Sequence, residues 1–139
     1  IRGRTGVRAR GDGLSWAVAD LASDELLGSV GLFDLTDDLA VGEVGYWTHP
    51  AARGRGEMSA AVGLVLGHAF ETLGLQRVKA YAARDNAASR RVLEAKGLSE
   101  HGVERLGTVL GDGRADAVLY DVLREEWTRR SDVTPAGRR

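Results

Sequence analysis

The chain has 139 residues, of which 43% are hydrophobic, and this length and composition predict one domain with a single core. Nineteen basic residues are balanced by 20 acidic ones, so no overall charge favours binding to nucleic acid or to an anionic lipid surface. The absence of cysteine excludes disulfides, thiolate metal sites and a cysteine acyl-enzyme intermediate.

The first segment, residues 1–13, has no apolar periodicity and contains four arginines and four glycines. We expect a flexible arm or the cut edge of a longer chain, because no aromatic residue is interleaved that would stack on RNA bases. The segment also lacks the charged, apolar and small-residue regions of a signal peptide, and no apolar run of about 18 residues follows it. We therefore expect no membrane contact and a cytoplasmic protein.

Three short segments then favour β-structure. Residues 14–19 alternate imperfectly between apolar and polar types, and residues 25–33 follow a polar turn. Residues 41–48 contain the β-branched and aromatic side chains that strands prefer. We predict three sequential antiparallel strands, ended by Pro50, which cannot donate a ladder hydrogen bond.

The period then changes to that of a helix over residues 59–73. One stripe contains the apolar residues Val62, Val65, Leu66, Ala69, Phe70 and Leu73. Gly74 suits the position after the helix, and residues 77–82 alternate as a half-buried strand. The handedness of crossovers makes this strand parallel to the one before the helix, in a β-α-β unit.

A shorter helix and a hairpin complete the predicted domain. Either Asp85 or Asn86 caps a helix that runs to Lys96 and ends at Gly97. Two strands, residues 98–110 and 114–123, flank an Asp-Gly turn that favours a hairpin. The predicted domain is therefore residues 14–127, and residues 128–139 are expected to be a flexible tail.

The loop between the third strand and the first helix reads Arg-Gly-Arg-Gly-Glu-Met-Ser over residues 53–59. A glycine-rich loop at a helix N-terminus presents main-chain N–H groups and the positive end of the helix dipole, which suits a diphosphate. Such a loop is often only a turn. A P-loop would need lysine at Glu57, and a dinucleotide fingerprint would need glycine at Ser59.

Three segments, in order and at family-like spacing, resemble the GNAT superfamily of acetyltransferases. They are the strand and loop over residues 42–56, the Asn-x-x-Ser helix over residues 85–98, and the closing segment over residues 117–127. The resemblance is greatest to the branch that includes the ribosomal-protein N-terminal acetyltransferases. Agreement extends over about residues 16–127.

The resemblance implies an α+β fold with a mixed, mostly antiparallel sheet around the central β-α-β unit. The sheet would be splayed open between the strand ending near Thr48 and the strand over residues 77–82. The chain departs from the family pattern twice. Met58 replaces the small residue that usually ends the loop, and there is hardly room before Trp16 for the usual N-terminal strand and two helices. The chain would then be a fragment, or its acceptor side would be reduced.

The resemblance further implies that acetyl-CoA or coenzyme A lies in the splayed opening. The pantetheine arm would pair with the main chain over residues 47–49, and the pyrophosphate would bind the amides of residues 55–59. Asn86 would bind the pantetheine, act only as the helix cap, or do both. The implied cofactor-binding residues are Trp47, Thr48, His49, Arg53, Gly54, Arg55, Gly56, Glu57, Met58, Ser59, Asn86 and Ser89.

Direct acetyl transfer to an amine needs a path for the amine proton and a group that stabilises the departing thiolate. Glu43 is the candidate base, acting directly or through water, and is otherwise a solvated carboxylate. Ser89, in the first turn of its helix, is the candidate thiolate partner or only a local helix cap. Tyr120 matches a family position assigned as general acid, and is otherwise a core tyrosine.

Two neighbouring arginines, Arg90 and Arg91, form a solvated helix face unless one of them reaches the adenosine phosphates. No two histidines have HExxH spacing, so we expect no metal site. The predicted function is acetyl-CoA-dependent N-acetyl transfer to a primary amine of a protein N-terminus or a small molecule. The alternative is a coenzyme A-binding module without turnover. The expected partner is the amine acceptor, and a homodimer is left open.

Overall fold

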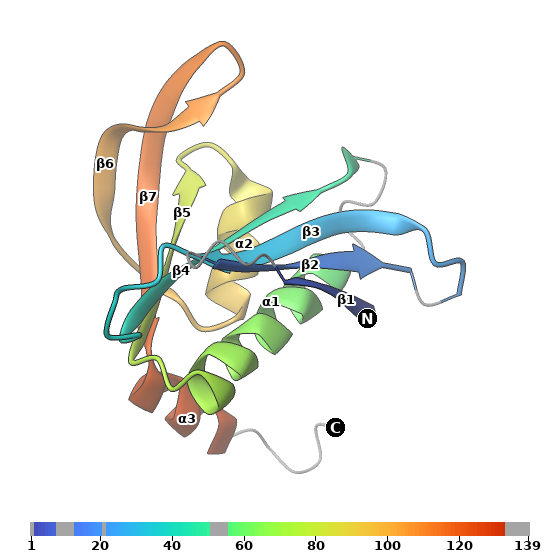
Figure 1. The fold of residues 1–139 in the computed structure, drawn as a ribbon. Helices are drawn as coiled ribbons and strands as arrows, with labels where there is room; N and C mark the ends of the chain where they lie inside the picture. Colours follow the sequence, from blue (N-terminus) through green and yellow to red (C-terminus); the bar gives the residue numbers. More distant parts are fainter. Residues whose placement is uncertain (1, 8–12, 21, 51–55, 133–139) are drawn as a thin grey trace.

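A computed structural model describes residues 2–7, 13–20, 22–50 and 56–132. They form one seven-stranded sheet in the order β1-β2-β3-β4-β5-β7-β6, with helices packed on one face (Figure 1). The strands are β1 Arg2–Val7, β2 Gly13–Ala19, β3 Leu26–Phe33, β4 Val41–Thr48, β5 Arg77–Ala83, β6 Ser99–Leu110 and β7 Gly113–Leu123. The helical segments are α1 Glu57–Gly67, the π-helical η2 His68–Thr72, α2 Ala87–Ala95 and α3 Arg124–Asp132. Among the strands of the described residues, only β4 and β5 pair in parallel, which confirms the predicted mixed α+β fold.

Both ends of the chain contain more regular structure than the sequence pattern predicted. Arg2–Val7 forms strand β1, paired antiparallel with β2, where a flexible arm was expected over residues 1–13. An edge strand needs main-chain partners but no buried apolar face, so periodicity does not reveal it. Helix α3 likewise continues to Asp132, beyond the predicted domain boundary. Its Trp127 ring packs against Phe70, with centroids 5.4 Å apart.

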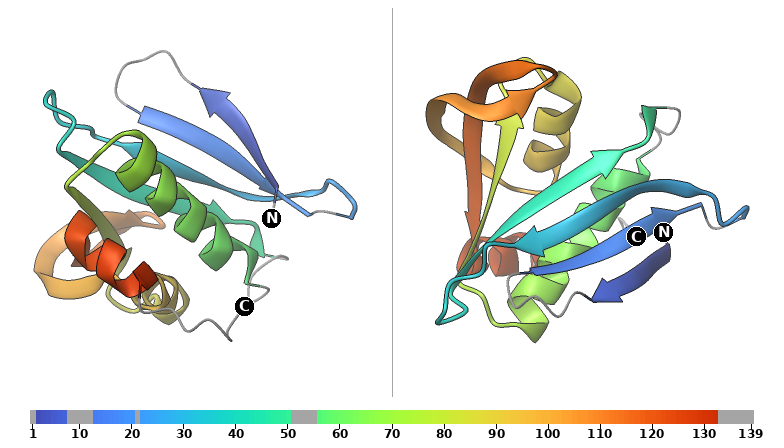
Figure 2. Two further views of the ribbon diagram at one scale, coloured as in Figure 1. Left: turned by 90° about the horizontal axis from the view of Figure 1, so that it is seen from below. Right: turned by 45° about the horizontal axis from the view of Figure 1, so that its top comes forward.

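The core lies between the sheet and the helix pair α1 and η2, which runs across β2, β3 and β4 (Figure 2, left). The predicted apolar stripe faces the sheet, and its Val62, Leu66 and Ala69 are fully buried. In η2 the Leu73 amide donates to the His68 carbonyl oxygen at 3.0 Å, a spacing of five residues. At the other end of this helix pair, α1 begins at Glu57, two residues before the predicted start.

The sheet is splayed at its centre, as expected. Strand β4 pairs with β5 at three positions only, Val41↔Arg77, Gly42↔Val78 and Glu43↔Lys79. Beyond these positions the two strands diverge (Figure 2, right). On its outer edge β4 stays paired with β3, and β5 stays paired with β7. These pairings fix the positions of both strands although they are not paired with each other along the opening.

The second helix and the last hairpin also follow their local signals. Asn86 caps α2, its Oδ1 accepting from the Ser89 amide at 3.1 Å, and Gly97 ends the helix with a φ of 93°. The β6–β7 hairpin closes at the pair Leu110↔Gly113. A register shift between Glu104 and Thr108 bends β6, and this bend places Leu106 beside the splayed opening.

Candidate functional site

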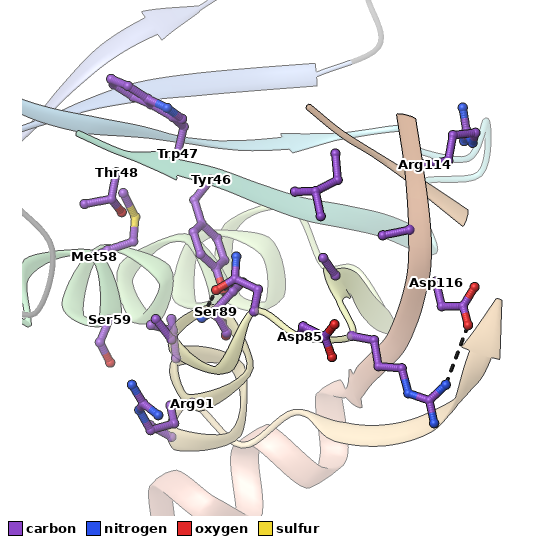
Figure 3. A pocket seen from close by; sticks show the side chains of 18 of the residues that line it. Tyr46, Trp47, Thr48, Met58, Ser59, Asp85, Ser89, Arg91, Arg114 and Asp116 are labelled. Atoms are coloured by element: carbon purple, nitrogen blue, oxygen red, sulfur yellow. Dashed lines mark hydrogen bonds and ion pairs between the residues drawn. The ribbon is translucent and has the colours of Figure 1, made fainter. Parts of the chain in front are cut away.

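A cavity of about 1220 Å³ occupies the opening between β4 and β5 (Figure 3). It is bounded by the end of β4, the start of α1, the turn after β5, one side of α2 and the β6–β7 hairpin. Predicted site residues that line it are Trp47, Thr48, Gly56, Met58, Ser59, Asn86 and Ser89. Residues without a predicted role also line it, including Tyr46, Arg84, Leu106, Leu110, Arg114 and Asp116.

The N-terminus of α1 borders this cavity. Gly56 precedes the helix with a φ of 84°, in the left-handed region, and in the described part of the loop no side chain caps the helix. A Cβ added at Gly56 would meet no atom of the described residues within 4 Å. The first-turn amides of a helix lack partners within the helix, so they favour an anion here. The predicted loop residues Arg53, Gly54 and Arg55 lie outside the described residues.

Met58 replaces a small residue of the family pattern. Its side chain is 7% exposed and belongs to the hydrophobic core. Gly28 on β3 provides the space, because a Cβ there would lie 3.1 Å from the Met58 Cε. The larger side chain therefore packs beneath the sheet, and Gly56, Met58 and Ser59 all line the cavity.

The main chain of β4 corrects one detail of the predicted cofactor contacts. The His49 amide already donates to the Leu27 carbonyl oxygen of β3, at 2.7 Å. Main-chain groups on an antiparallel strand alternate between its two edges, so those of Trp47 also face β3. Tyr46 and Thr48 are the residues whose main-chain groups face the opening. The Trp47 side chain, 50% exposed, points away from the face that carries Tyr46 (Figure 3).

Ser89 lies in the first turn of α2, where the helix dipole favours negative charge. Its Oγ is 2.8 Å from the hydroxyl oxygen of Tyr46, and the same tyrosine hydroxyl donates to the Ser89 carbonyl oxygen at 3.0 Å. Burial raises the pKa of Tyr46. Sequence reasoning gave Tyr46 no role, although a tyrosine two residues beyond the core residue Val44 must place its hydroxyl on the helix side of β4.

Glu43 is the last β4 residue that is still paired with β5. Because Val44 points into the core, Glu43 points to the opposite face of the sheet, and it does not line the cavity. Burial raises the pKa of its half-buried carboxyl, and the charges of Asp34 and Glu104 raise this pKa further, while Lys79 lowers it. A carboxylate with a raised pKa accepts a proton more readily than an exposed one.

Tyr120 was predicted to be either a general acid or a core tyrosine, and the structure places it in the core. Its side chain is fully buried and does not line the cavity. The hydroxyl accepts from the Arg90 Nε at 2.8 Å and donates to the Glu94 Oε2 at 3.1 Å. Burial raises the pKa of Tyr120. Both hydrogen-bonding positions of the hydroxyl are thus taken by Arg90 and Glu94.

The two neighbouring arginines of α2 have different surroundings. Arg90 turns inward and also donates to the Arg84 carbonyl oxygen and to the Glu100 carboxylate, at 3.1 and 2.9 Å. Arg91 lines the cavity on the side of Ser59 (Figure 3). Arg90 is therefore a structural residue, whereas Arg91, one position later in the helix, can contact an anion in the opening.

The described ranges contain neither a metal cluster nor a membrane-spanning helix. No group of three or more His, Asp or Glu side chains there could hold a metal ion. None of the helices in that part of the chain has the length and apolar character needed to cross a bilayer.

Comparison with known proteins places this geometry in a family. The family model described as Acetyltransferase (GNAT) domain matches residues 2–99. The chain is 36% identical over 107 residues to the "Putative ribosomal N-acetyltransferase YdaF" of Bacillus subtilis, covering 77% of this chain and 58% of the relative. It is 38% identical over 85 residues to the "Probable N-acetyltransferase YjcK" of the same organism, covering 60% and 47%. The chain thus spans about half the length of these curated relatives.

Solved structures have the same fold. One titled "Crystal structure of Probable acetyltransferase" superposes with a TM-score of 0.77 at 34% identity, covering 86% of this chain and 66% of that one. The spermidine N-acetyltransferase SpeG of Vibrio cholerae, as its F149A mutant, superposes with a TM-score of 0.78 at 20% identity, covering 88% and 72%. At 20% identity this second likeness shows the shared fold alone.

Proposed function

The chain belongs to the GNAT acetyltransferase family, and on that premise we propose that it transfers an acetyl group from acetyl-CoA directly to a primary amine. The observation that carries the proposal is the parting of β4 from β5 after three paired positions, with a cavity of about 1220 Å³ in the gap. Parted strands offer main-chain donors and acceptors to an extended ligand. The amide-bearing pantetheine arm has that chemistry.

The described residues fit each part of the proposed cofactor. The start of α1, with Gly56 and Ser59, would bind the diphosphate, and Arg91 would add positive charge on the same side. The main chain of Tyr46 and Thr48 would pair with the pantetheine arm. Among the described residues, the Asn86 side chain bonds only through its Oδ1, which caps α2, so the two Nδ2 donors suit a pantetheine carbonyl.

Acetyl-CoA supplies the acetyl group as a thioester, and the protein supplies proton management. Glu43 would take the proton of the attacking amine, directly or through one water molecule, from the face of the sheet opposite α1. Ser89 would donate its hydroxyl hydrogen bond to the departing sulfur, next to the positive end of the α2 dipole. The acyl carbon loses its bond to sulfur and gains one to nitrogen. The amine proton passes to Glu43 and from there to solvent, and it balances the charge of the released thiolate.

The acceptor is proposed only as a primary amine. One relative is named as a ribosomal N-acetyltransferase and one structural neighbour as a spermidine N-acetyltransferase. Both names describe donation to an amine, one on a protein and one on a small molecule. We therefore propose a protein N-terminus or a small polyamine as the acceptor classes to be screened.

Calorimetry with acetyl-CoA, followed by thiol release with a panel of amines, tests the proposal. We expect saturable binding and release of coenzyme A that depends on one class of amine, with a mass gain of one acetyl group on that amine. Failure to bind acetyl-CoA would contradict the cofactor site. If acetyl-CoA binds but no coenzyme A is released in the presence of any protein or polyamine acceptor, the result would favour a coenzyme A-binding module without turnover.

A further inference from the structure

Tyr46 connects the two sides of the splayed opening. Its side chain leaves β4 on the face that carries α1 and reaches the first turn of α2 (Figure 3). The hydroxyl oxygen is 2.8 Å from the Ser89 Oγ and 3.0 Å from the Ser89 carbonyl oxygen. The strand and the helix that flank the proposed thioester site are therefore joined by one phenol.

The contact between the Tyr46 and Ser89 hydroxyl groups has two states, which differ in the direction of the hydrogen bonds. A phenol and a serine hydroxyl carry one proton each. When the Tyr46 hydroxyl donates to the Ser89 carbonyl oxygen, the Ser89 hydroxyl can donate to the phenol oxygen. When Tyr46 donates to the Ser89 Oγ instead, the serine proton is directed elsewhere. The heavy atoms stay in place in both states, so only two hydroxyl rotations separate them.

The second state suits a departing thiolate. A hydroxyl whose oxygen accepts a hydrogen bond becomes a stronger donor, because hydrogen bonds in a chain polarise one another. Burial raises the pKa of Tyr46, so the phenol keeps its proton and acts as a hydrogen-bond donor rather than as an acid. No covalent bond of Tyr46 or Ser89 changes, and no proton is lost from the pair.

We infer that Tyr46 is a positioning residue for the proposed acetyl transfer: it turns its hydroxyl from the Ser89 carbonyl oxygen to the Ser89 Oγ and thereby aims the serine proton at the sulfur. The inference rests on the proposed function. It also differs from a purely structural role, in which Tyr46 only ties β4 to α2. A structural tie would affect stability and cofactor binding, whereas aiming a proton at the sulfur affects the chemical step.

A double-mutant cycle of Tyr46→Phe and Ser89→Ala tests the inference with the full chain. We expect Tyr46→Phe to lower kcat about tenfold, with the KM for acetyl-CoA changed by less than about twofold, because the lost interaction is made in the transition state. In the Ser89→Ala background, Tyr46→Phe should have no further effect on kcat. Tyr81→Phe is the matched control, since it removes a hydroxyl from a half-buried tyrosine outside the cavity.

Three outcomes would overturn the inference. They are an unchanged kcat in Tyr46→Phe, an equal loss of kcat in both serine backgrounds, and a loss that appears mainly in KM together with a lowered unfolding temperature. Failure of the proposed function looks different. If the unaltered chain releases no thiol with any amine, the transfer reaction itself is contradicted and the role of Tyr46 with it.

Discussion

At the scale of single residues, the proposed chemistry depends on how neighbours set the proton affinity of Glu43. The carboxyl is half-buried on the face of β4 opposite the helices, near the acidic Asp34 and Glu104 and the basic Lys79. Burial is the largest influence and raises its pKa. A base is most useful when its pKa approaches the working pH, so this environment favours the role that we propose.

We predict that Glu43→Gln lowers kcat/KM at neutral pH and abolishes the fall in activity toward acid. In the unaltered chain kcat/KM should rise with pH through the raised pKa of Glu43, because only the carboxylate accepts a proton. Rate profiles against pH measure this effect. Glu25→Gln, an exposed residue in the turn before β3, is the control and should leave the profile unchanged. A retained acidic limb in Glu43→Gln would exclude Glu43 as the base.

The raised pKa of Glu43 also affects the stability of the folded protein. A raised pKa means that the folded protein binds this proton more tightly than the unfolded chain does. The stabilisation due to Glu43 is therefore full in acid, and it is lost as pH rises through the raised pKa. Glu43→Gln should flatten this part of the stability profile, as measured by urea unfolding at several pH values.

Substitutions at Gly56 test the proposed diphosphate site and separate the effect of a side chain's charge from the effect of its size. Gly56→Asp should weaken acetyl-CoA binding at least about tenfold, or about 1.4 kcal/mol, because a carboxylate would face the proposed diphosphate. Gly56→Asn is the matched control, since asparagine has nearly the same size and tolerates the left-handed φ of 84°. Calorimetry measures both. Equal affinities for the two variants would contradict the assignment of the diphosphate to this loop.

At the scale of elements, the first turn of α2 combines a structural cap with the proposed chemistry. The Asn86 side chain holds the Ser89 amide, and Tyr46 holds the Ser89 hydroxyl and carbonyl group. The position of the serine is thus controlled from the loop before the helix and from β4. Loss of the Asn86 cap affects the helix start rather than a single atom.

We predict that Asn86→Ala destabilises the domain by about 1 kcal/mol, the usual cost of losing an N-cap. Asn86→Ser keeps a capping oxygen and should restore most of this stability, as measured by thermal unfolding. If Asn86 also binds the pantetheine, the KM for acetyl-CoA should stay raised in Asn86→Ser. A normal KM in this variant would restrict Asn86 to its capping role.

At the scale of the whole molecule, the sheet is two halves joined through three paired positions of β4 and β5. One half contains β1 to β4 with α1, and the other contains β5, β7 and β6 with α2. A ligand that bonds to both edges of the gap would join the halves beyond these positions. Ligand binding should therefore stabilise the domain as a unit.

We expect acetyl-CoA at 100 times its Kd to stabilise the folded state by about 2.7 kcal/mol, with a rise of several degrees in the unfolding temperature. Hydrogen exchange should slow at the amides of Tyr46 and Thr48, which face the opening. The amide of His49, already bonded to β3, serves as the internal reference. Protection of His49 without protection of the other two would contradict the proposed placement of the pantetheine.

Much of the fold could be predicted because its signals are local. The stripe of α1, the boundaries of β4, the Asn86 cap and the Asp-Gly hairpin each depend on residues close together in the chain. Edge strand β1 escaped prediction because main-chain pairing alone defines it. Of the residues predicted to bind the cofactor, seven line one cavity: Trp47, Thr48, Gly56, Met58, Ser59, Asn86 and Ser89.

The order of strand, loop and helix in the sequence was sufficient by itself to predict the β-α-β unit, because periodicity and turn chemistry act over a few residues. The family resemblance rested on three short sequence segments. Only the tertiary structure decided that Tyr120 is enclosed by Arg90 and Glu94, and that Tyr46 meets Ser89, 43 positions later in the chain. Contacts of this kind depend on how strands and helices pack against each other. A small rotation of α2 would change both contacts without altering any local pattern.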